Sequence, residues 1–240
     1  MSLKILIFTS LVLTFICFAG IVYSLKYQKP SQLSWSTCSK LFGSGVLAFM
    51  ADTLGIGSFI VNTALAKILG TAHDDEIPAV NNGAQVLPGA LSALFFITYV
   101  DVDVLTLYTL VFGACIGGII GGIVISRLNK QSICLMMVAC FTLIALLLIF
   151  RKLGILSING AELSLTSWKL IVGFLGMILS GILSSTGVGL FAIVQGVLFL
   201  LGMSPIVAFP IMMVAGAMQQ PLTTMMFLRQ GRIPIKRTLI

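Results

Sequence analysis

The chain has 240 residues, of which 58% are hydrophobic and only 9% are charged, and its mean hydropathy is +1.13. A soluble domain of this size needs far more charge to keep its surface in water, so the composition indicates an all-α polytopic membrane protein. The net charge of +7 does not indicate nucleic acid, because most basic residues lie at the ends of apolar runs, where they orient membrane helices. We therefore expect a multi-pass protein of the cell membrane, surrounded by the lipid bilayer.

Apolar runs long enough to cross a hydrocarbon core of about 30 Å recur along the chain, without the strand-like alternation of an outer-membrane barrel. The first run, residues 3–25, is longer than a signal core and lacks a clear cleavage site, so we expect a retained helix. About seven membrane segments are predicted: 3–25, 41–68 (broken at 55–57), 77–99, 104–126, 131–150, 168–201 (broken at 187–189) and 205–228. The connections are short, apart from 26–40 and 151–167.

The sequence repeats itself. A shift of 132 residues places LFGSGVLAFMADTLGIGSFIVNTALAKILG (41–70) on GFLGMILSGILSSTGVGLFAIVQGVLFLLG (173–202), with both Gly-x-Gly-x-Phe motifs and both Leu-Gly pairs in register. We divide the chain into 1–40 (first helix and cytoplasmic loop), 41–150 (first transporter repeat) and 168–240 (second repeat). The second repeat looks incomplete, since the counterpart of the glycine-rich helix after residue 113 would begin where the sequence ends.

Repeated halves with paired helix breaks are typical of secondary transporters, where the broken helices meet near the bilayer midplane. The broken segments either cross the membrane or re-enter it from one side. Counting Lys and Arg gives ten basic residues inside and four outside in both cases, so the count indicates a cytoplasmic tail and leaves this choice open.

Asp52 lies inside the first broken segment. A carboxylate in a membrane helix is costly, so it normally faces a cavity or a partner and marks a functional site. Asp52 is our candidate for proton coupling; it can also cap the half-helix after the break. The second repeat has Ser184 in register with Asp52, so the two halves are chemically unequal.

A helix that restarts after a break exposes backbone N–H groups at its positive end, which binds anions without a cationic side chain. Close helix packing is the alternative reason for the glycines. The predicted substrate-binding residues are Thr53, Gly55, Gly57, Ser58, Ser185, Thr186, Gly187 and Gly189. Amides in the spans serve either as glue between helices or as a polar route. The candidates for lining the pathway are Asn62, Asn82, Gln85, Gln195, Gln219 and Gln220. Pro88 and Pro221 are expected to mark kinks or a second break in each half.

The remaining motifs have simpler interpretations. HDDE (73–76) precedes Ile-Pro and is interpreted as a helix start rather than a metal site. Gly113, Gly117 and Gly121 form a small-residue face for packing within the chain or for a homodimer contact. The five cysteines are expected to be packing residues. We expect no metal, no cofactor and no enzyme activity, because no nucleophile–base arrangement, P-loop or HExxH motif is present.

The segments GVLAFMADTLGIGSF (45–59), IPAVNNGAQVLPGALSALFF (77–96) with YVDVD (99–103), and SGILSSTGVGLFAIVQG (180–196) resemble the TauE/SafE (sulfite exporter, TSUP-type) family of membrane transporters. This resemblance implies two related halves and transport of a small anion, such as sulfite, an organosulfonate or a related sulfur compound. The alternative from another class is a non-transporting membrane scaffold or assembly partner with a degenerate transporter fold.

Overall fold

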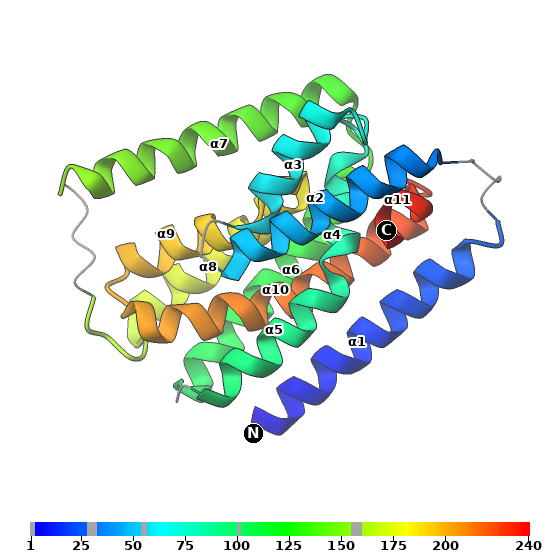
Figure 1. Ribbon diagram of the computed structural model, residues 1–240. Coiled ribbons are helices and arrows are strands. Elements are labelled where there is room, and N and C mark those ends of the chain that lie inside the picture. The colour runs from blue at the N-terminus through cyan, green and yellow to red at the C-terminus, as the bar shows by residue number, and fades with distance from the viewer. Residues whose placement is uncertain (1–2, 28–32, 54–56, 100–101, 155–159) are drawn as a thin grey trace.

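The computed structural model describes residues 3–27, 33–53, 57–99, 102–154 and 160–240, and these residues form a helical protein without named strands (Figure 1). The helices are α1 Leu3–Ser24, α2 Trp35–Thr53, α3 Ser58–Leu69, α4 Ile77–Ala84, α5 Val86–Tyr99, α6 Val104–Ile125, α7 Lys130–Lys152, α8 Ser167–Leu183, the π-helical turn η1 Ser184–Val188, α9 Leu190–Leu200, α10 Pro205–Arg229 and α11 Ile235–Leu239.

Four helical segments in the described residues are long and apolar enough to cross a membrane: Lys4–Ser24, Val104–Ile125, Ser167–Val188 and Pro205–Arg229. Large apolar side chains on their outer surfaces are exposed, as with Phe15 on α1 and Trp168 on α8. Such surfaces suit a lipid environment. The prediction of an all-α membrane protein is confirmed at this level.

The helix boundaries differ from the expected spans in four places. The expected span 77–99 is divided into α4 and α5 at Gln85, three residues before Pro88, which has no N–H to continue the helical hydrogen bonding. α10 continues through Pro210 and Pro221, so of the two outcomes expected at Pro221, a kink or a second break, the break is absent. α2 begins at Trp35, inside the expected connection 26–40, and α11 was not predicted.

The small-residue face of α6 packs inside the chain. A Cβ atom added at Gly117 would lie 2.1 Å from the carbonyl oxygen of Ile178 on α8, and one at Gly113 would lie 2.8 Å from that of Phe174. Gly121 is similarly close to Ser185. α8 therefore covers this face, and we do not propose a homodimer through it.

The second broken segment is a hairpin. Glu162, before α8, accepts a hydrogen bond from the backbone N–H of Ser204, after α9, at 2.9 Å, and donates one to Gly202 at 3.2 Å. The chain thus enters along α8, turns at the break and returns along α9 to its starting end. α2 packs against α3 in the same way around the first break (Figure 1).

Several helix ends gather at one side of the molecule. Asp74, after α3, forms ion pairs with Lys67 and Lys130, and Arg232, after α10, donates to the carbonyl of Ser126 at the end of α6 at 3.0 Å. Glu76, before α4, pairs with Arg237 on α11. We call this side the Arg237 face. The other end of α6 lies with Glu162, because Thr106 accepts a hydrogen bond from the N–H of Leu165 at 3.0 Å; we call that side the Glu162 face.

Candidate functional site

The glycines that precede the short helices after the two breaks have similar backbone conformations. Gly57 (φ 94°, ψ 119°) precedes α3, and Gly189 (φ 99°, ψ 143°) precedes α9. L-amino acids rarely adopt such φ values, so glycine is required at both positions. Each short helix is also followed by a glycine in a left-handed conformation, Gly70 (φ 61°) and Gly202 (φ 84°). The glycines that the predicted repeat places in register, Gly57 with Gly189 and Gly70 with Gly202, therefore have the same kind of backbone conformation.

Asp52 lies in the last turn of α2, and its side chain reaches across the first break to the start of α3. Its side chain is buried with 7% exposure. Oδ1 accepts the backbone N–H of Ser58 at 2.9 Å, and Oδ2 accepts Nε2 of Gln85 at 3.2 Å. The hydroxyl of Ser58 donates to Oε1 of Gln85 at 3.2 Å, which closes a ring of three residues.

Within this ring, which we call the carboxylate ring, Ser58 and Gln85 hold the Asp52 carboxylate at the N-terminus of α3. The first N–H of α3 has no partner within the helix, and the positive end of the helix dipole favours a negative charge there. Asp52 therefore caps α3, as one of the two interpretations of the sequence expected. The ring also brings together three of the predicted site residues, Asp52, Ser58 and Gln85, from two different segments of the chain.

The second break meets the first one. The carbonyl of Gly187 accepts Nδ2 of Asn81 at 3.0 Å and the hydroxyl of Thr63 at 3.2 Å. A Cβ atom added at Gly189 would lie 3.0 Å from Cβ of Phe59, at the start of α3. The interrupted segments from the two halves thus contact one another in the interior of the protein.

A small cavity of about 30 Å³ lies beside the carboxylate ring. Its polar lining comes from Ser58, Asn62, Asn81 and Gln85, and its apolar lining from α2 and Phe59. Asn62 donates to Oδ1 of Asn81 at 2.7 Å, so the two amides form one network with Thr63 and Gly187. We call this space the inner chamber.

The hydroxyls of the second break bond to their own helix. Ser185 donates to the carbonyl of Gly181 at 2.9 Å, and Thr186 donates to that of Leu183 at 2.6 Å. Ser185 also lies 3.4 Å from the hydroxyl of Thr223 on α10. These residues are fully buried, and they do not face the inner chamber.

The other predicted amides are placed along α4, α9 and α10. Asn82 donates to the carbonyl of Pro78 at 2.8 Å, and Gln219 donates to Thr223 at 2.6 Å. The side-chain oxygens of Asn82, Gln219 and Gln220 are buried without a hydrogen-bond partner. Gln195 is half-buried on α9 and does not line the inner chamber. Gly55 and the side chain of Thr53 lie outside the described residues.

Three residues that bind or enclose the site were not among the predicted site residues. Asn81 and Thr63 hold the carbonyl of Gly187, and Phe49 lines the inner chamber from α2. The repeated amides of Asn81-Asn82 were a usable signal for Asn81. Phe49 gave no signal, since an aromatic residue is ordinary in an apolar helix.

The HDDE segment forms a helix start with ion pairs. Glu76 accepts the backbone N–H of His73 at 3.0 Å, and α4 begins at the next residue with Pro78 in its first turn. Among the described residues, no group of three or more His, Cys, Asp or Glu side chains is placed to hold a metal ion. Comparisons with protein-family models, curated proteins and solved structures give no match to this chain.

Proposed function

We propose that this protein is a secondary transporter of a small anion, with its site at the start of α3. The observation that carries the proposal is the carboxylate of Asp52, held by the N–H of Ser58 and the amide of Gln85 at a buried helix N-terminus. In the structure these two donors bind the carboxylate oxygens of Asp52. The oxygens of a small substrate anion can accept the same hydrogen bonds.

The same arrangement supplies a coupling mechanism. The Asp52 carboxylate and a substrate anion compete for the same two donors, and a second negative charge beside the first is unfavourable in a buried site. Protonation of Asp52 removes its charge and releases the N–H of Ser58. Anion binding is then linked to proton binding at one residue, as expected for a proton-coupled carrier.

The architecture supports transport by two inverted halves. α2–α3 turns back toward the Arg237 face, and α8–α9 turns back toward the Glu162 face, so the hairpins have opposite directions. Their breaks have matching glycine conformations and meet in the interior. Inverted repeats with such breaks are a common transporter design. We propose about seven membrane segments in these two halves, in the cell membrane.

The resemblance to the TauE/SafE family directs the choice of substrate toward sulfite, organosulfonates and related sulfur compounds. The segments that carry the resemblance include Asp52, Ser58 and Gln85. The three residues of the carboxylate ring are thus the ones we propose to meet this class of anion.

One observation favours the alternative of a non-transporting scaffold. Every donor of the carboxylate ring already has a partner within the chain, and the inner chamber of about 30 Å³ has room for about two water molecules. A protein that only assembles with others needs no open substrate site at its helix breaks, and a closed site of this kind fits that role.

Flux measurements separate the two functions. The purified chain is reconstituted into liposomes, and uptake of radiolabelled sulfite, thiosulfate or taurine is followed with and without an imposed proton gradient. Transporter function predicts saturable uptake of at least one anion that depends on the gradient. Uptake equal to that of protein-free liposomes for all three anions supports the scaffold.

A further inference from the structure

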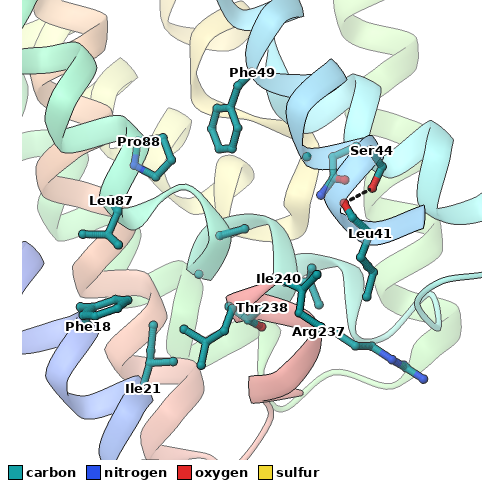
Figure 2. Close-up of a pocket in the computed structure, with 16 residues that line it drawn as sticks. Phe18, Ile21, Leu41, Ser44, Phe49, Leu87, Pro88, Arg237, Thr238 and Ile240 are labelled. Carbon is teal, nitrogen blue, oxygen red and sulfur yellow. Dashed lines mark hydrogen bonds between the residues drawn. The ribbon is translucent and has the colours of Figure 1, made fainter. Parts of the chain in front are cut away.

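A second, larger cavity of about 240 Å³ lies between α1, α2, the α4–α5 segment and α11 (Figure 2). Phe18 and Ile21 come from the end of α1, and Leu41 and Ser44 from the start of α2. Thr238 on α11 and Ile240, directly after that helix, also line the cavity. The cavity is therefore built from helix ends that belong to the Arg237 face.

This cavity adjoins the inner chamber. Both are lined by Gly45, Phe49, Asn62 and Ala84. Figure 2 shows Phe49 at one end of the larger cavity and Thr238 and Arg237 at the other. The larger cavity thus extends from the Arg237 face to Phe49, whose side chain also lines the inner chamber together with Ser58 and Gln85.

Basic residues lie at the Arg237 end of the larger cavity, where they favour the entry of an anion. Arg237 lines the cavity, its neighbour Lys236 is in the same short helix, and Lys40 precedes the wall residue Leu41. Arg237 pairs with Glu76. A cavity whose entrance carries positive charge concentrates small anions by electrostatic attraction.

The distribution of basic residues also indicates on which side of the membrane the Arg237 face lies. The hairpin geometry puts Lys67 and Lys130 on the same side as Arg232 and Arg237, together with Lys40, Arg127, Arg229 and Lys236 at neighbouring helix ends. The Glu162 face carries Lys169 and, at the ends of α1 and α7, Lys4, Arg151 and Lys152. Because Lys and Arg accumulate on the cytoplasmic side of membrane proteins, the Arg237 face is the cytoplasmic one.

We infer that this cavity is the cytoplasmic access vestibule of the Asp52 site, through which a small anion reaches the inner chamber, and that the ring of Phe49 forms the partition between the two. This inference rests on the proposed function. It adds the path by which the anion reaches the site, the side of the membrane from which it enters, and the residue that separates the two cavities. The narrow inner chamber requires Phe49 to move before an anion larger than water can pass.

Thiol labelling tests the route without measuring transport. The five native cysteines are replaced with alanine, and a single cysteine is introduced as Ser44→Cys in the vestibule or as Ser58→Cys in the inner chamber. Ala48→Cys serves as a second inner-chamber reporter if Ser58→Cys does not fold. Right-side-out and inside-out vesicles are treated with an anionic, membrane-impermeant methanethiosulfonate.

We expect Ser44→Cys to react from the cytoplasmic side only, and faster with the anionic reagent than with a cationic one after correction for their rates with a free thiol. The inner-chamber cysteine reacts slowly, and adding Phe49→Ala raises its rate by about tenfold or more, equivalent to a barrier lowered by about 1.4 kcal/mol. The control is Phe42→Ala, on the same helix but with its side chain 64% exposed, which leaves the rate unchanged.

Three results overturn the inference: reaction of Ser44→Cys only with a hydrophobic, membrane-permeant reagent, reaction from the outer side, or no difference between Phe49→Ala and Phe42→Ala. The proposed function fails separately. Labelling as expected with no anion flux would leave a water-filled route without transport, whereas flux without the Phe49 effect would place the route elsewhere.

Discussion

The hydroxyl of Thr63 donates a hydrogen bond to the carbonyl of Gly187, a residue 124 positions further along the chain. Gly187 has φ 90° and lies in the break after α8, so its carbonyl is free of the regular helical hydrogen bonds. A hydroxyl from the helix that follows the first break satisfies it. The second interruption thus depends on the helix that follows the first one for a hydrogen-bond partner.

Asn81 is expected to contribute most to this junction, because its Nδ2 contacts both Thr63, at 2.8 Å, and the carbonyl of Gly187, at 3.0 Å. Asn81→Ala removes the shorter of the two hydrogen bonds to the buried Gly187 carbonyl and leaves the Nδ2 of Asn62 without its acceptor, which costs about 1–3 kcal/mol. Thermal unfolding in detergent should show the loss, with Gln195→Ala as a control outside the junction. Equal midpoints for the two variants would contradict the assigned role.

Membrane topology gives an independent check of the hairpins. If the broken segments re-enter the membrane, single cysteines at Asp75 and Gln230 react with an impermeant reagent from the same side, and one at Thr166 reacts from the opposite side. If all segments cross, Asp75 lies outside while Thr166 and Gln230 lie inside. Ion pairs of Asp74 with Lys67 and Lys130 favour the first outcome.

Asp52→Asn tests proton coupling. The asparagine can still accept the N–H of Ser58 but cannot carry the charge that competes with the substrate. We expect anion flux in proteoliposomes to lose its dependence on pH, while the variant elutes as the folded protein. Asp75→Asn, a loop carboxylate, should keep the dependence. A pH profile of Asp52→Asn that matches the unmodified protein would remove Asp52 from the coupling mechanism.

The helical class, both breaks and the capping role of Asp52 could be predicted from sequence because each depends on local chemistry. Glycines such as Gly57 and Gly189 mark backbone conformations that other residues avoid, and a carboxylate in an apolar run is visible by itself. The contacts of Asn81 with Gly187 and of Phe49 with the inner chamber depend on distant segments. The choice between crossing and re-entry also escaped prediction, since both give the same count of basic residues.

Gly117→Ala should separate α6 from α8. The added Cβ would lie 2.1 Å from the carbonyl of Ile178, a backbone atom that cannot rotate away. Overpacking of this kind costs about 1–3 kcal/mol. The matched control is Gly43→Ala on α2, where an added Cβ meets nothing within 4 Å and where alanine favours the helix. The prediction fails if both variants unfold at the same temperature in detergent.

Asp103 provides a pH-dependent contribution to stability at the start of α6. Hydrogen bonds from the hydroxyl of Thr106, at 2.6 Å, and from its backbone N–H, at 2.8 Å, hold the pKa of Asp103 below its ordinary value. A lowered pKa in the folded state stabilises the protein above the unfolded pKa of about 3.9, and this stabilisation disappears as the pH falls through the folded pKa.

Asp103→Ala removes the helix cap and should lower the free energy of unfolding near neutral pH by about 0.5–2 kcal/mol. Asp103→Asn keeps an acceptor for the N–H of Thr106 but cannot titrate, so it should retain part of the stability and lose the pH dependence that this residue contributes. Unfolding midpoints in detergent, measured from neutral to acidic pH, should therefore show the difference between the unmodified protein and Asp103→Ala shrinking as the pH falls, while the difference between Asp103→Asn and Asp103→Ala stays constant. A constant difference between Asp103→Ala and the unmodified protein down to the lowest pH would show that the charge of Asp103 contributes nothing to the cap.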